Sequence, residues 1–211
     1  MPDEVLKFDE LNSIRTAVEY EVLAGQLPEI KFDKKRTEDF IFELLTMAYA
    51  FGLEKASDEL GISIPLNETL MRDTVMAETA GETFVDRLNK HIDAANASLS
   101  ADPTQLMTAA ATLINELAVL AETEAHRVLN TAILDGADYY KAKNPDAQVS
   151  KTWITMEDDR VRDTHFYIHG VTIPTDAKFY TYDGDSAMRP GGFTLPQNNV
   201  NCRCTLELRA H

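Results

Sequence analysis

The chain holds its only two cysteines, Cys202 and Cys204, as one C-x-C pair within the run VNCRCTLEL. In an extended strand, residues i and i+2 point to the same face, so both thiols would lie on one side of this run. The pair therefore fits a buried core strand, because free cysteine is among the most buried residue types. A disulfide between them is disfavoured, because Cα atoms at this spacing in a strand lie near the upper limit of disulfide geometry. A metal site is the third interpretation.

The run THFYIH supplies further donors for a metal site. His165 and His169 are four residues apart, which on a helix places both side chains on one face. A site of His165, Cys202 and Cys204, completed by His169 or Asp163, would suit zinc. We predict His165, Cys202 and Cys204 as its ligands, with a metal-free core as the alternative. No cofactor other than this zinc ion is expected.

These residues also define the enzymatic alternative, a metal-dependent hydrolase or nuclease in which zinc-bound water is the nucleophile. Asp159, Asp163 and His169 would lie beside the zinc. The run HFYIH has the spacing of a zincin helix but lacks the glutamate that would act as general base. Asp183 and Asp185 lack the twelve-residue pattern of a calcium loop and are expected as turn residues. With no complete catalytic motif, we expect no enzymatic activity.

Short elements must position the candidate ligands. The runs VSKTWI, VTIP, KFYTY and CRCTLEL are strand-like, and RVRDTHFYIHG is expected to form a short helix. The runs DGDSAMRPGGF and LPQNN are rich in turn residues. Trp153, the only tryptophan, is predicted as the core anchor, and Arg160 is expected to form an ion pair within this region.

Long helices are predicted upstream of residue 148. Apolar residues recur at helical spacing from Leu11 to Val22, from a cap at Thr37 to Gly61, and from a cap at Asn67 to about Leu99. Asp102 with Pro103 marks the start of a fourth helix, which should stop before Asn144-Pro145. His126 and Arg127 on this helix are expected at the surface or in an interdomain contact. The fold class is α+β, with a helical region over 1–148 and a small α+β domain over 149–211.

The bulk composition excludes several classes of protein. The 211 residues carry a net charge of −15, which argues against nucleic-acid binding through a broad basic face. No stretch approaches the roughly 20 apolar residues of a membrane span, and the run MPDEVLKFDE does not resemble a signal peptide. Two cysteines are too few for a disulfide framework, so we expect a protein made in a reducing cytoplasm.

From about residue 120 to 208, the order of motifs resembles the C-terminal domain of the Mu F-like phage head morphogenesis proteins, also called phage minor head proteins. N-C-R-C following D-D-R-V-R is a specific combination, whereas either run alone would be weak. The resemblance is carried by Glu122-Thr123-Glu124, Arg127, Asn130, Trp153, Asp158-Asp159-Arg160-Val161, His165, Gly170, Ile173, Pro174, Phe179 and the closing run Asn201-Cys202-Arg203-Cys204.

The resemblance implies a structural protein of the phage virion, made in the cytoplasm of the bacterial host and located in the head near the portal. Its implied partners are the portal protein, the major capsid protein, or both, and further copies of itself. Whether it stays in the head or leaves with the DNA is left open. The family often carries C-x-x-C after D-x-R-V, where this chain has Arg162 and His165. A four-thiolate zinc site is therefore excluded, whereas a site of His165, Cys202 and Cys204 is not.

Overall fold

The computed structural model describes residues 32–79, 84–98 and 103–211. They fall into two compact units, one of residues 32–45, 72–79, 84–98 and 103–122 and one of Thr46–Met71 with Thr123–His211. We call them unit 1 and unit 2. The predicted helix between Leu11 and Val22 and the predicted cap at Asp102 lie outside the described residues.

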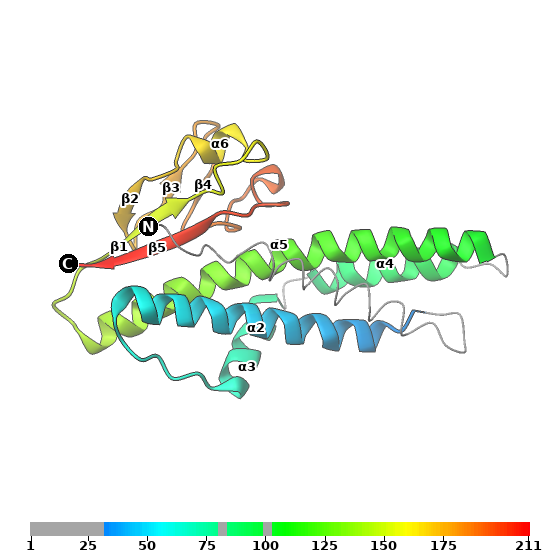
Figure 1. Ribbon diagram of the computed structural model, residues 1–211, viewed down its shortest axis with the longest axis horizontal. Helices are drawn as coiled ribbons and strands as arrows, with labels where there is room; N and C mark the ends of the chain where they lie inside the picture. Colours follow the sequence, from blue (N-terminus) through cyan, green and yellow to red (C-terminus); the bar gives the residue numbers. More distant parts are fainter. Residues whose placement is uncertain (1–31, 80–83, 99–102) are drawn as a thin grey trace. The chain divides into compact units, whose positions relative to one another are not determined.

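Among the described residues, four helices precede the strands, namely α2 (Lys34–Leu60), α3 (Glu68–Thr79), α4 (Phe84–Ser98) and α5 (Pro103–Lys143) (Figure 1). Two predicted boundaries are confirmed. Asn67 caps α3 by accepting a hydrogen bond from the Leu70 N–H at 2.9 Å, and α5 ends immediately before Asn144-Pro145. The predicted cap at Thr37 is wrong, because Asp33 accepts the Arg36 N–H at 2.9 Å and starts α2 one turn earlier.

Unit 1 is held by an apolar stripe and by polar contacts at its surface. Phe84, Leu88 and Ile92 of α4 recur every four residues, and each is at most 1% exposed. Around this stripe, the Phe32 N–H donates to Asn96, and Lys34 pairs with Asp93. The repeated spacing places these apolar side chains on one face of α4, and that face is buried.

Within unit 2, α2 and α5 pack closely through small residues. A Cβ atom added at Gly52 would clash with the Leu129 carbonyl, and one added at Gly136 would clash with the Ala56 side chain. Glycine is therefore required at both crossing points. Tyr49 of α2 also donates a hydrogen bond to Asp135 of α5.

The rest of unit 2 contains a module of short strands, which we call the strand module (residues 149–211). β1 (Val149–Ile154) lies between β2 (Thr172–Pro174) and β5 (Thr205–Ala210) in an antiparallel sheet of order β2-β1-β5 (Figure 1). β3 (Phe179–Tyr180) pairs with β4 (Ser186–Ala187) in a second sheet. α6 (Asp163–Phe166) and a 3-10 turn (Pro196–Asn198) complete it. The predicted α+β class is confirmed.

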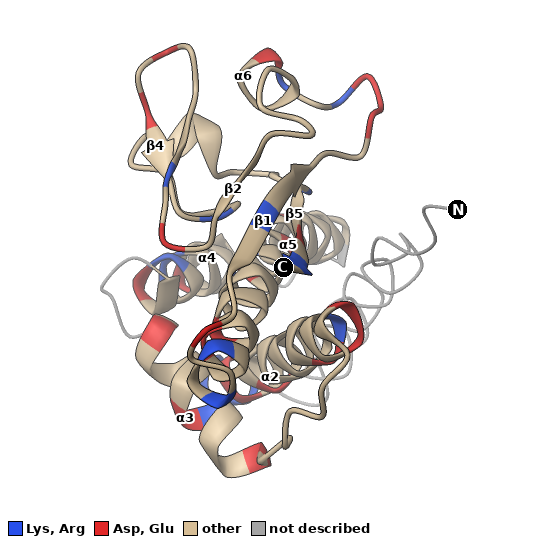
Figure 2. Cartoon of the chain, turned by 90° about the vertical axis from the view of Figure 1, so that its left-hand side faces the viewer, with Lys and Arg blue, Asp and Glu red and all other residues tan. Residues whose placement is uncertain are grey.

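Two strand predictions need correction. The strand expected over CRCTLEL begins only at Thr205, because the backbone before it turns through Asn201, whose φ is +56°. β4 lies in a run that was expected to form turns only. The acidic residues of the strand module lie mainly on the loops that join its elements (Figure 2).

Side chains of the helices cover the outer edge of β5. The Leu206 N–H donates to Asn130 of α5 at 3.0 Å, and the Leu208 N–H donates to Glu59 of α2 at 2.8 Å. An uncovered strand edge is a template for pairing with another chain, so these contacts protect β5. They also fix the register of the strand module on the two helices.

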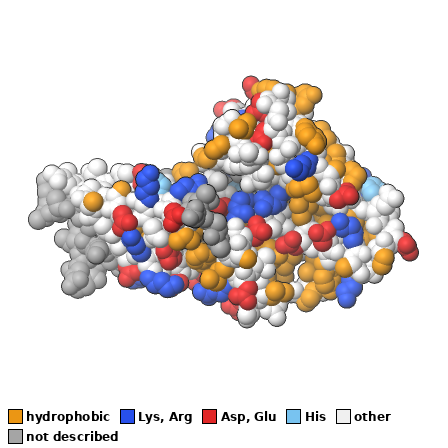
Figure 3. Space-filling model, turned by 180° about the vertical axis from the view of Figure 1, so that it is seen from behind, with side chains coloured by type: hydrophobic (Ala, Val, Ile, Leu, Met, Phe, Trp, Pro, Cys, Tyr) orange, Lys and Arg blue, Asp and Glu red, His pale blue; other side chains and the backbone are white. Residues whose placement is uncertain are grey.

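No helix among the described residues is long and apolar enough to cross a membrane. On the face drawn in Figure 3, Lys and Arg side chains lie among Asp and Glu side chains, with hydrophobic side chains between them.

Candidate metal centre

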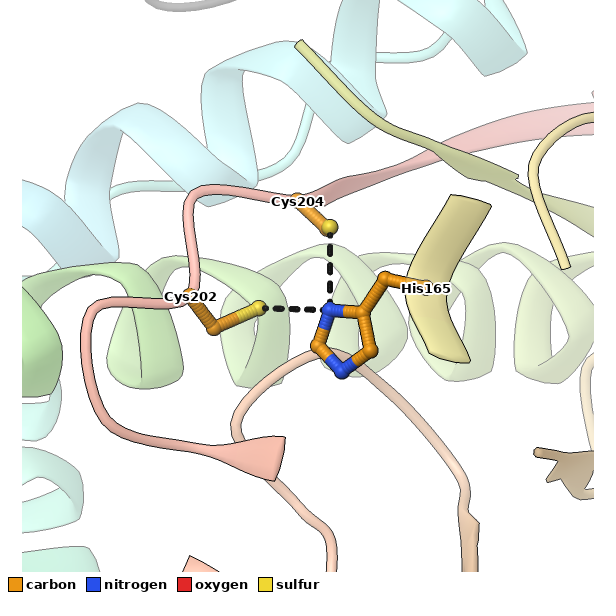
Figure 4. Close-up of side chains that lie close together, drawn as sticks. All are labelled: His165, Cys202 and Cys204. Atoms are coloured by element: carbon orange, nitrogen blue, oxygen red, sulfur yellow. Dashed lines mark hydrogen bonds between the residues drawn. The ribbon is translucent and has the colours of Figure 1, made fainter. Parts of the chain in front are cut away.

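The structure brings the three predicted ligands together. The Nδ1 atom of His165 lies 3.6 Å from Cys202 Sγ and 3.4 Å from Cys204 Sγ (Figure 4). The three donor atoms all lie within 4.8 Å of one another, and all three residues are buried. Both cysteines are free thiols, in agreement with the expectation that no disulfide joins them. Two sulfurs and an imidazole nitrogen form a donor set that suits zinc.

The local sequence explains why both thiols point inward. Asn201 adopts the left-handed conformation that asparagine tolerates better than most residues, and its N–H donates to Thr123 of α5 at 3.2 Å. Beyond this turn, Cys202 and Cys204 are each 4% exposed, while Arg203 between them is half-buried. The predicted alternation is therefore present, although it precedes β5 rather than forming part of it.

Arg203 connects the two sequence runs whose combination was specific. Its guanidinium donates to both carboxylate oxygens of Asp158, at 2.8 and 2.6 Å, and Arg160 lies 3.5 Å from the same carboxylate. These hydrogen bonds, above all those from Arg203, lower the pKa of Asp158 to about 2. A bidentate ion pair between one residue of each therefore joins the D-D-R-V and N-C-R-C runs in the fold.

His165 is held in the core by aromatic rings. It is 1% exposed, its ring lies edge-to-face on Trp153 at 5.3 Å, and it stacks on Phe193 at 5.2 Å. Trp153 is fully buried and also packs on Phe179, which confirms it as the core anchor. The same aromatic core therefore orients the imidazole toward the two sulfurs.

The two thiols have different proton affinities. The pKa of Cys202 is held well below its ordinary value, chiefly by the hydrogen bond with Cys204, and His165 lowers it further. The pKa of Cys204 is raised by that same hydrogen bond and by burial. Cys202 is therefore the more readily deprotonated of the two thiols, and the thiolate is the form that binds a metal.

The other predicted ligands are not in the cluster. Among the described residues, the group that includes Cys202 and Cys204 contains no carboxylate and no second histidine. α6 ends at Phe166, so His165 and His169 do not share a helical face, and His169 Nδ1 instead contacts Thr155 Oγ1 at 3.0 Å. The expectation that His169 or Asp163 lies beside the thiols is therefore wrong.

A histidine that the sequence placed elsewhere is also buried in unit 2. His126 of α5 is 8% exposed, and neither ring nitrogen has a hydrogen-bond partner among the described residues. Burial lowers the pKa of His126 to about 4. The expected surface position is therefore wrong, whereas the other alternative, a contact between the helical region and the small domain, agrees with the face of α5 on which His126 lies. The sequence signal that could have indicated burial was the position of His126 one turn before Asn130, on the helix face that meets the strand module.

The cluster suits a structural metal better than a catalytic one. A catalytic zinc ion keeps an open position for water, and hydrolysis needs a general base beside it. Here the three donors are at most 4% exposed, and among the described residues no carboxylate joins them. The geometry therefore offers no support for the hydrolase or nuclease alternative.

Comparison with known proteins gives two matches. The profile of the family described as Phage Mu protein F like protein matches residues 68–207. NAD(+)--arginine ADP-ribosyltransferase EFV of Enterococcus faecalis (strain ATCC 700802 / V583) is 27% identical over 162 residues, which cover 71% of this chain and 33% of that protein. The chain thus spans about a third of this relative's length. No solved structure is significantly similar to the chain.

The family match covers well over half of the chain, from α3 into β5. It includes the buried cluster, the Asp158–Arg203 pair and the Asn130 contacts that attach β5 to α5. The resemblance inferred from the order of motifs is therefore confirmed, and the chain belongs to the Phage Mu protein F like protein family of phage head morphogenesis proteins.

Proposed function

We propose that this protein is a minor head protein that binds the portal protein, the major capsid protein, or both, and assists assembly of the phage head. The observation that carries the proposal is the family match over residues 68–207. That match spans α3, α4 and α5 as well as most of the strand module, so the family relationship includes parts of both units. On this proposal the protein is made in the host cytoplasm and incorporated into the virion.

An exposed group of aromatic residues supplies a surface for such a partner. Tyr167 and Tyr182 are 65% and 60% exposed, and their rings pack edge-to-face at 5.8 Å. Their chain neighbours Phe166 and Tyr180 are 64% and 67% exposed. Exposed aromatic residues are enriched at protein interfaces, where they supply much of the binding energy. We call Tyr167 and Tyr182 the aromatic patch and propose it as the docking surface.

The proposed role is structural rather than enzymatic. The Enterococcus relative is named as a transferase, but this chain spans only about a third of that protein. An activity named for the longer protein does not pass to a segment of it. We therefore propose no transferase activity here.

The first test is quantitative mass spectrometry of the chain in full particles and in particles emptied of DNA, scaled to the number of portal subunits. A fixed ratio in both kinds of particle supports a built-in head component. Presence only in full particles supports a protein that is ejected with the genome. Absence from both kinds of particle and from assembly intermediates overturns the proposal.

The second test examines the aromatic patch. The double variant Tyr167→Ala, Tyr182→Ala should fold normally, because both side chains are exposed, but should be depleted from particles by roughly ten-fold or more. Met107→Ala is the matched control, since Met107 is an equally exposed apolar side chain (64%) on α5. Unchanged incorporation of the double variant would exclude the aromatic patch as the docking surface.

A further inference from the structure

The buried cluster lacks one donor of a complete structural zinc site. Structural zinc sites built from cysteine and histidine are almost always tetrahedral, with four protein ligands. Among the described residues, the cluster contains three, namely His165, Cys202 and Cys204. A fourth ligand would close the site and exclude water.

The contacts of α5 place His126 on the helix face that meets the cysteine segment. Residues three and four apart share a helix face, so Thr123, His126 and Asn130 line one side of α5. Thr123 accepts the Asn201 N–H at 3.2 Å, and Asn130 donates to the Cys204 carbonyl at 3.1 Å. His126 lies between these two contacts on the helix, and the cysteine segment runs between the same two contacts on the strand side.

The state of His126 needs an explanation that packing alone does not give. Both ring nitrogens are buried with no hydrogen-bond partner among the described residues, and an unpartnered buried polar group costs roughly 1–3 kcal/mol. The Nε2 atom of His165 is likewise without a partner among the described residues, but its Nδ1 atom already faces both sulfurs.

We propose that His165, Cys202 and Cys204 bind a zinc ion, and that His126 of α5 turns inward to supply the fourth ligand. The resulting Cys2His2 site joins α5 to the strand module at the point where Asn130 already attaches β5. His126 lies outside the present group of donors, so ligation requires a change in its side-chain torsion angles. Binding releases the protons still held on the two thiols, which enter solvent as the sulfurs become thiolates.

Zinc binding at this site has a structural consequence that does not depend on particle assembly. A closed four-ligand site leaves no position for a reacting water. It stabilises the fold by crosslinking α5 to the strand module. Zinc binding and head incorporation are measured separately. Failure of one proposal therefore leaves the other intact.

The test uses the full chain, purified without chelator and without a histidine tag. Elemental analysis should find one zinc ion per chain, and the double variant Cys202→Ser, Cys204→Ser should lose it. His126→Phe should weaken zinc binding by roughly ten-fold or more, because it removes one ligand and keeps the volume of the side chain. His91→Gln is the control, since His91 pairs with Glu116 in unit 1, and it should bind zinc as the wild type does.

X-ray absorption of the zinc-loaded wild-type protein counts the ligands without any variant. Two sulfurs and two imidazoles support the complete proposal. Two sulfurs and one imidazole, with unchanged affinity in His126→Phe, overturn the role of His126. Absence of zinc after incubation with excess metal, with no change in thermal stability on adding chelator, overturns the site altogether.

Discussion

Unit 1 and the strand module of unit 2 are stabilised in different ways. In unit 1, α4 buries a regular apolar stripe, and ion pairs such as Lys34–Asp93 lie at the surface. In the strand module, polar and charged side chains are buried, among them Lys151 and Asp185. A stripe tolerates exchange of one apolar residue for another, whereas a buried polar group has a fixed set of partners. The strand module is therefore the region in which single polar substitutions should have large effects.

Asp185 should give the largest effect. It is 6% exposed, and its carboxylate accepts the N–H groups of Ser186, Thr194 and Leu195 at 2.8 to 3.1 Å, as well as the Asn198 amide. Burial alone would raise its pKa, but hydrogen bonds from Asn198 and these N–H groups outweigh that effect and hold the pKa below its ordinary value. Asp185→Ala leaves three backbone donors without a partner and should cost about 3–5 kcal/mol.

Hydrogen exchange measured by mass spectrometry tests this prediction by region. In Asp185→Ala, amide protection should fall across residues 149–211 and should remain unchanged in α4. Asp159→Ala is the matched control, because Asp159 is an exposed acid in the same module, and it should change stability by less than about 0.5 kcal/mol. Equal losses of stability in the two variants would show that the buried carboxylate of Asp185 stabilises the fold no more than an exposed one.

Lys151 should give the next largest effect. Its ammonium group donates to the carbonyls of Thr175 and Met188 at 2.8 and 2.7 Å, and the residue is 0% exposed. It ties β1 to the loops that follow β2 and β4. Lys151→Met leaves both carbonyls without this donor and should cost about 2–4 kcal/mol. Lys178→Met, at an exposed position of the same module, is the control.

The Lys151 effect should depend on pH with a defined sign. Burial lowers the pKa of Lys151 to about 8, below its ordinary value of 10.5. Between pH 8 and 10.5, the unfolded chain keeps a proton that the folded chain has lost, so the contribution of Lys151 to stability rises with pH in that window. The difference in unfolding free energy between wild type and Lys151→Met should therefore grow above pH 8. A difference that shrinks over this range would contradict the burial of a charged lysine.

Asp158 should give a smaller effect, because its side chain is 32% exposed and solvent screens the pair with Arg203. Asp158→Asn should cost about 1 kcal/mol at neutral pH. The pKa of Asp158 is about 2 in the folded chain against 3.8 ordinarily, so this contribution is present above pH 3.8 and is lost as the pH falls toward 2. Denaturant titrations of wild type and Asp158→Asn should therefore converge in acid. A constant difference would mean that the carboxylate does not act through its charge.

Features of the fold that depend on neighbouring residues could be predicted from the sequence. The end of α5 before Asn144-Pro145 and the cap at Asn67 depend on neighbouring residues, and both were predictable. The inward direction of Cys202 and Cys204 was predictable as well, because alternation is a local pattern. These features need no knowledge of what the rest of the chain does.

Apart from the cap at Asp33, which is local, the missed features discussed here depend on partners that are distant in the sequence. α6 stops at Phe166 because the chain must return to β1, where Gly170 N–H donates to the Trp153 carbonyl and Trp153 N–H donates to the Val171 carbonyl. This return separates His169 from His165. The burial of His126 and Lys151 likewise follows from tertiary packing, which no periodicity in their own segments reveals.

The smallest effect should come from the ion pair of unit 1. Lys34 and Asp93 approach to 2.7 Å, but their side chains are 43% and 62% exposed. Water and salt screen such a pair, and ordering two long side chains costs entropy, so Lys34→Ala should change the unfolding free energy by less than about 0.5 kcal/mol. Hydrogen exchange of α2 and α4 in low and high salt would measure the effect of Lys34→Ala. Lys35→Ala, which removes the exposed pair of Lys35 with Asp39, is the comparison. A loss above roughly 1.5 kcal/mol would show that unit 1 also depends on specific polar partners, since exposed pairs seldom contribute that much.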